Sequence, residues 1–135
     1  MSDAGVDLTG GEQDSAVDTR RIMAAGALLA ALGVALGAFG AHGLERVLDE
    51  RAMGWWQTAV SYQMWSALGL VGLGASRRTL GLPALLIGIG AIIFSGGLYA
   101  MALTGARWLG MVVPIGGAAM IVGWLFAAWR INARA

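Results

Sequence analysis

The chain alternates between long apolar stretches and short polar segments. Four stretches of 20 or more residues contain no charged side chain, namely residues 22–41, 52–76, 79–106 and 108–129. A helix needs about 20 apolar residues to cross the hydrocarbon core of a bilayer. The stretches are apolar all round rather than along one stripe, and a globule of 135 residues has too little interior to bury four such helices. The pattern therefore predicts four transmembrane helices, over about residues 21–41, 53–76, 82–104 and 108–131.

Polar segments flank the first predicted helix on both sides. Residues 1–20 carry five acidic side chains among Gly, Ser and Thr, and we expect this tail to be disordered without a partner because it has little to bury. After the first helix, Leu44, Val47 and Leu48 share one helical face with charges opposite, which predicts a short helix on the membrane surface. The expected fold class is an all-α integral membrane four-helix bundle over residues 21–131, with this interfacial helix and a polar N-terminal tail.

Glycine and alanine recur along the apolar stretches, and along the first one they are spaced three and four residues apart. In lipid, such small residues let helix backbones approach closely. We therefore predict helix-packing positions at Gly26, Gly33, Gly37, Gly96, Gly97, Gly116, Gly117 and Gly123. These small-residue faces either pack within one bundle or dock a partner helix.

Composition agrees with a membrane protein and narrows the possible partners. Hydrophobic residues make up 58% of the chain and charged residues 13%, and the mean hydropathy is +0.70. A net charge of +1, with nine arginines dispersed in ones and twos, leaves no basic face for nucleic acid. The chain has no cysteine, so disulfides and thiolate metal sites are excluded. The expected partners are membrane lipids and either other membrane-protein subunits or a second copy of the chain.

The arginines near the helix ends indicate an orientation. Arginine and lysine are enriched in cytoplasmic loops. Six arginines lie on the side that both termini share, namely Arg20, Arg21, Arg77, Arg78, Arg130 and Arg134, and three lie on the other side, namely Arg46, Arg51 and Arg107. We therefore expect a multi-pass protein with both termini in the cytoplasm.

Polar side chains within the apolar stretches are the candidate functional groups. The second stretch holds the densest set, which consists of Gln57, Thr58, Ser61, Tyr62, Gln63 and Ser66. In lipid such groups usually form hydrogen bonds to neighbouring helices, each worth about 0.6–2 kcal/mol. A binding pocket between the helices is the alternative interpretation.

His42 is the only histidine, and it is expected at the membrane edge to which Arg107 returns. Imidazole can bind a metal or relay a proton, but the apolar stretches offer no cysteine or carboxylate to complete a zinc or haem site. The simpler interpretation is an interfacial histidine that bonds a neighbouring loop. His42 and Arg107 can alternatively receive an anionic headgroup or a partner's carboxylate. Because the chain also lacks lysine and any carboxylate inside the membrane, we expect neither catalysis nor a metal or cofactor.

Four ordered motifs resemble a known family. They are residues 36–42 (LGAFGAH), 58–63 (TAVSYQ), 94–99 (FSGGLY) and 114–117 (PIGG), followed by Gly123 and Trp124. Together they resemble the YgdD-like family of small inner-membrane proteins, domain of unknown function family 423, which is similar to transmembrane protein 256. The resemblance covers about residues 21–131 and implies a four-helix protein of the bacterial inner membrane with no established activity.

The same resemblance selects candidate positions. The retained motif residues are His42, Tyr62, Gln63, Ser95, Tyr99 and Pro114. Ser66 stands where the family usually carries a histidine, so a metal or proton role at that position is in doubt in this chain.

Two functions remain open at this stage. We expect a non-catalytic accessory or scaffold subunit that packs against a larger membrane complex. The alternative is a binding or carrier protein that holds a lipid, quinone or small solute near Tyr62, Gln63 and Tyr99. A third hypothesis, in which residues 44–56 sense the bilayer surface, is weaker because that segment carries charges of both signs.

Overall fold

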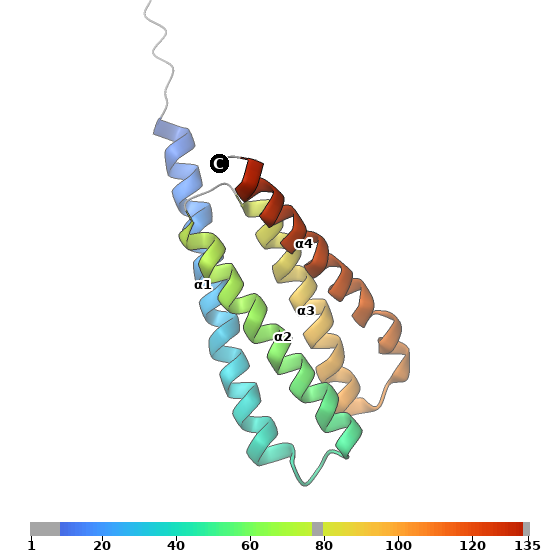
Figure 1. The fold of residues 1–135 in the computed structure, drawn as a ribbon. Helices are drawn as coiled ribbons and strands as arrows, with labels where there is room; N and C mark the ends of the chain where they lie inside the picture. The colour runs from blue at the N-terminus through green and yellow to red at the C-terminus, as the bar shows by residue number, and fades with distance from the viewer. Residues whose placement is uncertain (1–8, 77–79, 134–135) are drawn as a thin grey trace, which may run out of the picture.

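The computed structural model describes the backbone of residues 9–76 and 80–133, and the side chains from residue 18 onward within those ranges. The described chain is all-α (Figure 1). Its elements are α1 (Thr9–Phe39), a π-helical turn (Gly40–Leu44), α2 (Glu50–Ala75), α3 (Gly81–Thr104), a 3-10 helix (Arg107–Met111) and α4 (Val113–Ala133).

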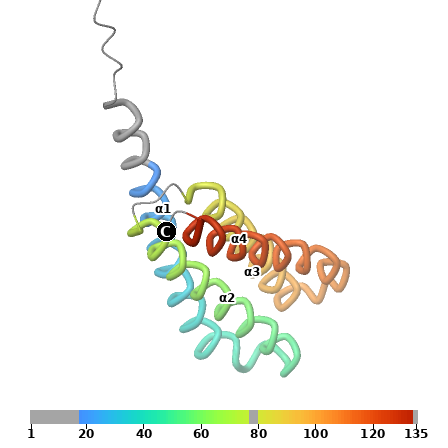
Figure 2. The backbone as a smooth tube through the Cα atoms, turned by 45° about the horizontal axis from the view of Figure 1, so that its top comes forward, coloured from blue at the N-terminus to red at the C-terminus, as the bar shows by residue number. Residues whose placement is uncertain are grey.

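The four long helices run antiparallel to their neighbours in the chain. α1 packs along α2, α2 along α3 and α3 along α4, whereas α1 and α3 approach each other at few positions. Figure 2 shows the resulting α1–α2 and α3–α4 pairs. Among the described residues, the backbones of α1 and α4 are not neighbours, so α2 and α3 occupy the centre. α1 begins and α4 ends at the same end of the molecule (Figure 1).

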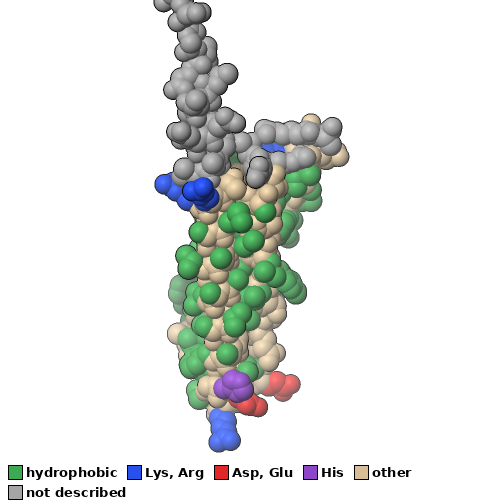
Figure 3. Space-filling view, turned by 90° about the vertical axis from the view of Figure 1, so that its left-hand side faces the viewer, with side chains coloured by type: hydrophobic (Ala, Val, Ile, Leu, Met, Phe, Trp, Pro, Cys, Tyr) green, Lys and Arg blue, Asp and Glu red, His purple; other side chains and the backbone are tan. Residues whose placement is uncertain are grey.

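Three segments are long and apolar enough to cross a membrane. They are Asp18–Leu44, Gly81–Thr104 and Arg107–Ala133, with mean hydropathies of 2.2, 2.0 and 2.0. α2 has 26 residues and is also long enough to cross a membrane. The polar side chains in its middle lower its mean hydropathy, so it is not among the candidate spans. On the face over α1, hydrophobic side chains cover the length of the helices while charged side chains gather at the two ends (Figure 3). The protein is therefore an all-α membrane protein with three candidate spans rather than the four expected.

The prediction of a short interfacial helix after the first long helix was wrong. Residues 44–51 form the end of the π-helical turn, a bend and the first residues of α2. Asp49 caps α2, because its Oδ1 accepts a hydrogen bond from the Ala52 amide at 2.8 Å. Leu44 is buried and Leu48 packs against the same cluster around Ala52 and Trp56, so these side chains turn toward the protein instead of the lipid.

The ends of α1 and α4 also differ from the predicted ranges. α1 begins at Thr9 rather than at residue 21, since extending an existing helix adds one hydrogen bond per residue without a new nucleus. The predicted disorder of the tail falls partly on residues 1–8, which lie outside the described residues. α4 begins at Val113 rather than at residue 108, and Pro114 lies in its first turn, where a missing N–H leaves no bond unmade.

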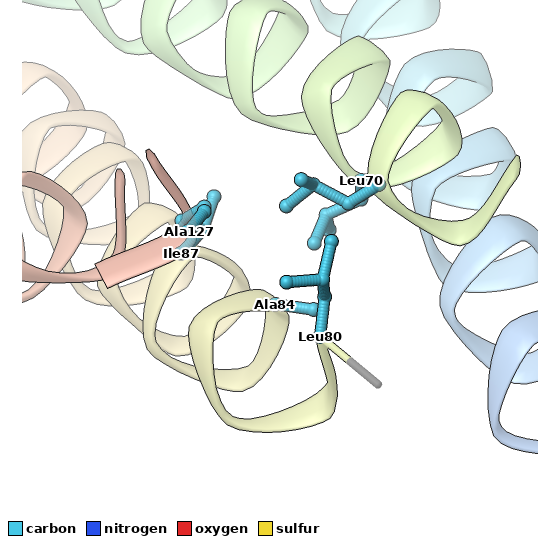
Figure 4. Close-up of a cluster of buried hydrophobic side chains, with 6 residues drawn as sticks. Leu70, Leu80, Ala84, Ile87 and Ala127 are labelled. Atoms are coloured by element: carbon cyan, nitrogen blue, oxygen red, sulfur yellow. The ribbon is translucent and has the colours of Figure 1, made fainter. Parts of the chain in front are cut away.

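A compact apolar cluster joins three helices at the end of the molecule where α1 begins and α4 ends. Leu70 of α2 packs with Leu80, Ala84 and Ile87 at the start of α3 and with Ala127 of α4 (Figure 4). Ile87 and Leu80 are almost completely buried. This cluster holds α2 against the α3–α4 pair and leaves the central part of α2 to carry polar side chains.

Candidate functional site

A buried hydrogen-bond network lies at the middle of α2. Gln63 is only 4% exposed. Its Nε2 donates to the carbonyl oxygen of Leu29 on α1 at 2.9 Å, and its Oε1 accepts a hydrogen bond from the Tyr99 hydroxyl of α3 at 2.7 Å. These bonds join α1, α2 and α3, and hydrocarbon offers no hydrogen-bond partners that could replace them.

Two glycines, Gly33 of α1 and Gly40 of the π-helical turn, lie beside the α1 carbonyls that accept from α2. Gly33 lies one turn after the carbonyl that accepts from Gln63, and a Cβ at Gly33 would stand 2.5 Å from the Met64 sulfur and 3.5 Å, an ordinary contact, from Nε2 of Gln63. Gly40 likewise lies one turn after Leu36, whose carbonyl accepts a hydrogen bond from Trp56 Nε1 at 2.9 Å. A Cβ at Gly40 would overlap the Trp56 indole. The absence of a side chain at Gly40 therefore lets the Trp56 indole reach the backbone, and its absence at Gly33 makes room for Met64 beside Gln63.

Two buried serines extend the network to the other helices. Ser95 Oγ of α3 donates to the carbonyl of Ala59 on α2 at 2.8 Å. Ser66 Oγ of α2 lies 3.4 Å from the Met120 sulfur of α4. In the part of the chain that the structure describes, no buried side-chain nitrogen or oxygen lacks a partner. The central polar side chains therefore join helices to one another.

The structure separates residues that the sequence analysis grouped together. Gln63 and Tyr99 meet, but Tyr62 is exposed on another face, where its ring lies 4.9 Å from Trp65 and 4.7 Å from Phe94 between centroids. Gln57 and Ser61 also lie outside the network. They line a cavity of about 220 Å³ between the end of α1 with the π-helical turn and the first half of α2.

The charged candidates lie at the end of the molecule where α2 begins. Arg107, Asp49 and Arg51 line an open cavity of about 410 Å³, which the α2 start shares with the α3 end. His42 is exposed in the π-helical turn and is not among the residues that line this cavity. Within the described ranges, no group of three or more His, Asp or Glu side chains comes close enough to hold a metal ion.

Most of the glycines singled out in the sequence lie at helix contacts. Gly26, Gly33 and Gly37 face α2, and Gly97, Gly116, Gly117 and Gly123 lie between α3 and α4. The backbones of α3 and α4 come close at Gly90 and Gly116, where a Cβ on either residue would stand 2.7 Å from the carbonyl oxygen of the other. Gly96 differs, because it is exposed and a Cβ there would meet nothing within 4 Å.

Sequence reasoning did not identify Trp56 as part of the network. The Trp56 side chain is 3% exposed, and its ring lies 4.6 Å from that of Tyr99 between centroids. In the sequence, the glycine one turn after each accepting carbonyl indicates where a side chain of a neighbouring helix can enter. It does not reveal which side chain from which helix enters the space.

These features define a small all-α membrane protein whose helices are joined by buried hydrogen bonds and glycine contacts. The family described as "Protein of unknown function (DUF423)" matches residues 36–117, and the chain belongs to that family. No solved structure matches the chain.

Relatives occur in species of Staphylococcus, Bacillus and Escherichia. A UPF0382 membrane protein of Staphylococcus haemolyticus is 45% identical over 104 residues, which cover 74% of this chain and 85% of the relative. The UPF0382 membrane protein YwdK of Bacillus subtilis is 41% identical over 110 residues, covering 74% of this chain and 86% of that protein. The UPF0382 inner membrane protein YgdD of Escherichia coli K12 is 38% identical over 96 residues, which cover 67% of this chain and 73% of that protein.

Proposed function

We propose that this protein is a non-catalytic accessory or scaffold subunit of the inner membrane, and that it binds a transmembrane helix of another membrane protein through the outer face of α2. The outer α2 face consists of Thr58, Tyr62, Trp65 and Leu68, all of which are exposed. The observation that carries the proposal is that two hydrogen-bond donors of this face lie near the middle of the helix without an acceptor.

Tyr62 and Trp65 supply these donors. Tyr62 is 39% exposed and Trp65 is 61% exposed, and no described residue accepts from the Tyr62 hydroxyl or the Trp65 indole N–H. Tryptophan normally lies at the membrane–water interface, where water and headgroups satisfy its N–H. Trp65 is well inside α2, so a bilayer offers it no acceptor, whereas a polar side chain or a glycine-exposed carbonyl of a partner helix does.

The non-catalytic part of the proposal is supported by the use of the buried polar groups. The side chains of Gln63, Ser95 and Tyr99 donate to other helices, and this use leaves them in fixed positions. The inner-membrane assignment is supported by the printed name of the Escherichia coli relative and by the apolar belt between charged ends (Figure 3). The arginine distribution supports a cytoplasmic location for both termini as part of this proposal.

The test is extraction of the protein from its own membranes in a mild detergent, followed by native gel electrophoresis and mass spectrometry. We expect a discrete assembly with a defined second protein at fixed stoichiometry, and at least a tenfold loss of that protein in the Trp65→Leu variant. Trp129→Leu is the matched control, because Trp129 is 63% exposed near the end of α4, away from the outer α2 face.

Two results would contradict the proposal. One is recovery of the wild-type chain only by itself or as an oligomer of identical copies. The other is retention of the second protein to the same extent in Trp65→Leu and wild type.

A further inference from the structure

The space between α1 and α3 forms a groove that no other part of the described chain fills. Its wider part has a volume of about 300 Å³ and is lined by Ile22 and Ala25 of α1 and by Ala84 and Gly88 of α3, among others. Its second part, of about 160 Å³, ends at Gln63. Leu29 and Ile92 line both parts, so the two adjoin. We call the whole the α1–α3 groove.

The groove is long compared with one leaflet of a bilayer. Its α1 wall extends from Arg21 to Leu36. At about 1.5 Å per residue this is a length of about 22 Å, whereas half the hydrocarbon thickness is about 15 Å. The groove thus starts at the membrane edge near the termini and continues past the midplane.

Its inner end offers unused hydrogen-bonding capacity. The primary amide of Gln63 has two N–H groups, and only one acceptor, the Leu29 carbonyl, is present for them among the described residues. The Tyr99 oxygen donates its proton to Gln63 and keeps a lone pair, and both side chains line this part of the groove. A head group with one oxygen atom can therefore accept from the amide, and a hydroxyl can also donate to the phenol.

The charges around the groove restrict the occupant further. The inner part is lined by apolar side chains, Gly96, Ser95, Gln63 and Tyr99, none of which is charged. An ionised head group at this depth would lack a counter-charge and would be strongly disfavoured. Arg21, the single charged residue along the described lining, lies at the opposite end.

We infer that the α1–α3 groove binds a neutral long-chain lipid, with a carbonyl- or hydroxyl-bearing head at Gln63 and Tyr99 and the chain extending toward Arg21. Prenylquinones have this chemistry. The inference is independent of the partner proposed for the outer α2 face, because the two sites use different residues.

The experiment uses purified full-length protein in phosphatidylcholine nanodiscs that contain a defined mole fraction of ubiquinone-10. Bound quinone per protein is measured by native mass spectrometry after gentle release. The wild type is expected to retain about one quinone. Gly96→Leu is expected to reduce retention at least tenfold, because the new side chain enters the inner part of the groove and meets no protein atom within 4 Å at its Cβ.

Gly54→Leu is the matched control. Gly54 is equally open, lies on α2 and lines neither part of the groove, so its replacement is expected to leave retention unchanged. Both variants replace a helical glycine by a better helix former, so loss of the helix does not account for a difference between them.

Three outcomes would overturn the inference. Equal retention in Gly96→Leu and wild type would remove the site. Equal retention of squalene, an isoprenoid without oxygen, and of ubiquinone would show that Gln63 and Tyr99 do not recognise the head group. Preferential retention of an anionic lipid such as cardiolipin, lost in Arg21→Gln, would assign the groove to a charged head group at its outer end instead.

Discussion

At the scale of single residues, we expect the stability of the protein to depend on hydrogen bonds from side-chain donors to backbone carbonyls of a neighbouring helix. Trp56 and Gln63 both reach carbonyls of α1 beside a glycine. Hydrogen bonds of this kind inside a membrane are individually modest because the unfolded chain in lipid also finds partners. Their effect is therefore measurable one residue at a time.

Gly40→Ala is expected to destabilise the protein by about 1–2 kcal/mol, because the new Cβ overlaps the Trp56 indole and moves it from the Leu36 carbonyl. The measurement is the free energy of unfolding in a titration of mixed micelles with dodecyl sulfate, followed by tryptophan fluorescence. Gly72→Ala is the control, since a Cβ there meets nothing and the change favours the helix slightly. Equal effects of the two substitutions would contradict the expectation.

The two tyrosines provide a second comparison. Tyr99→Phe leaves Gln63 Oε1 without its donor and is expected to lower the free energy of unfolding by about 0.6–2 kcal/mol. Tyr62→Phe removes a hydroxyl that no described residue binds, so the isolated protein is expected to keep its stability. The same unfolding titration distinguishes them, and a larger loss in Tyr62→Phe would show that the assignment of the two faces of α2 is wrong.

At the scale of elements, the start of α2 shows how one side chain changes the meaning of a hydrophobic pattern. The apolar positions of residues 44–48 fit a surface helix, yet Asp49 ends the turn and begins a new helix by accepting from the Ala52 amide. Leu44 and Leu48 then pack under the first turn of α2, and Val47 remains 73% exposed.

Asp49→Ala is expected to lower the stability by about 1 kcal/mol, the usual value of an N-cap, whereas Asp49→Asn keeps an acceptor and is expected to be nearly neutral. Val47→Ser is the companion variant, since an exposed turn residue contributes little to folding. Both effects are measured by thermal unfolding in detergent. A large effect of Val47→Ser together with a small one of Asp49→Ala would favour the surface helix instead.

At the scale of the whole molecule, antiparallel helices place the start of α1 and the end of α4 at one end and the α1–α2 and α3–α4 connections at the other (Figure 1). The chain has no cysteine, so single introduced thiols report orientation without background. In intact spheroplasts, Glu45→Cys is expected to react with a membrane-impermeant maleimide, and Asp18→Cys only after permeabilisation. The reverse pattern would place the termini outside the cytoplasm and contradict the arginine argument.

Several features followed from local sequence. The start of α3 near Pro83 and its end near Thr104 agree with the predicted range of 82–104, because proline suits a first helical turn and Gly105 adopts the left-handed conformation at the C-cap. The family followed from four short motifs, and the family match over residues 36–117 confirms it. The sequence analysis grouped Tyr62 with Gln63, and that grouping was wrong. The two are neighbours in the sequence, but their side chains lie on different faces of α2.

The reason lies in the solvent. In water, an apolar stripe fixes which face of a helix turns inward, but a helix that is apolar all round in lipid carries no such stripe. The sequence by itself therefore determined the number of long helices and approximately where each one lies, since length, hydropathy and capping are local properties. Only the tertiary structure decided how each helix is rotated about its axis, because that rotation depends on which side chain of a neighbour enters the space beside a glycine. It turned Gln63 toward Leu29 and Tyr99, left Tyr62 and Trp65 on the outside, and kept the α1–α3 groove open.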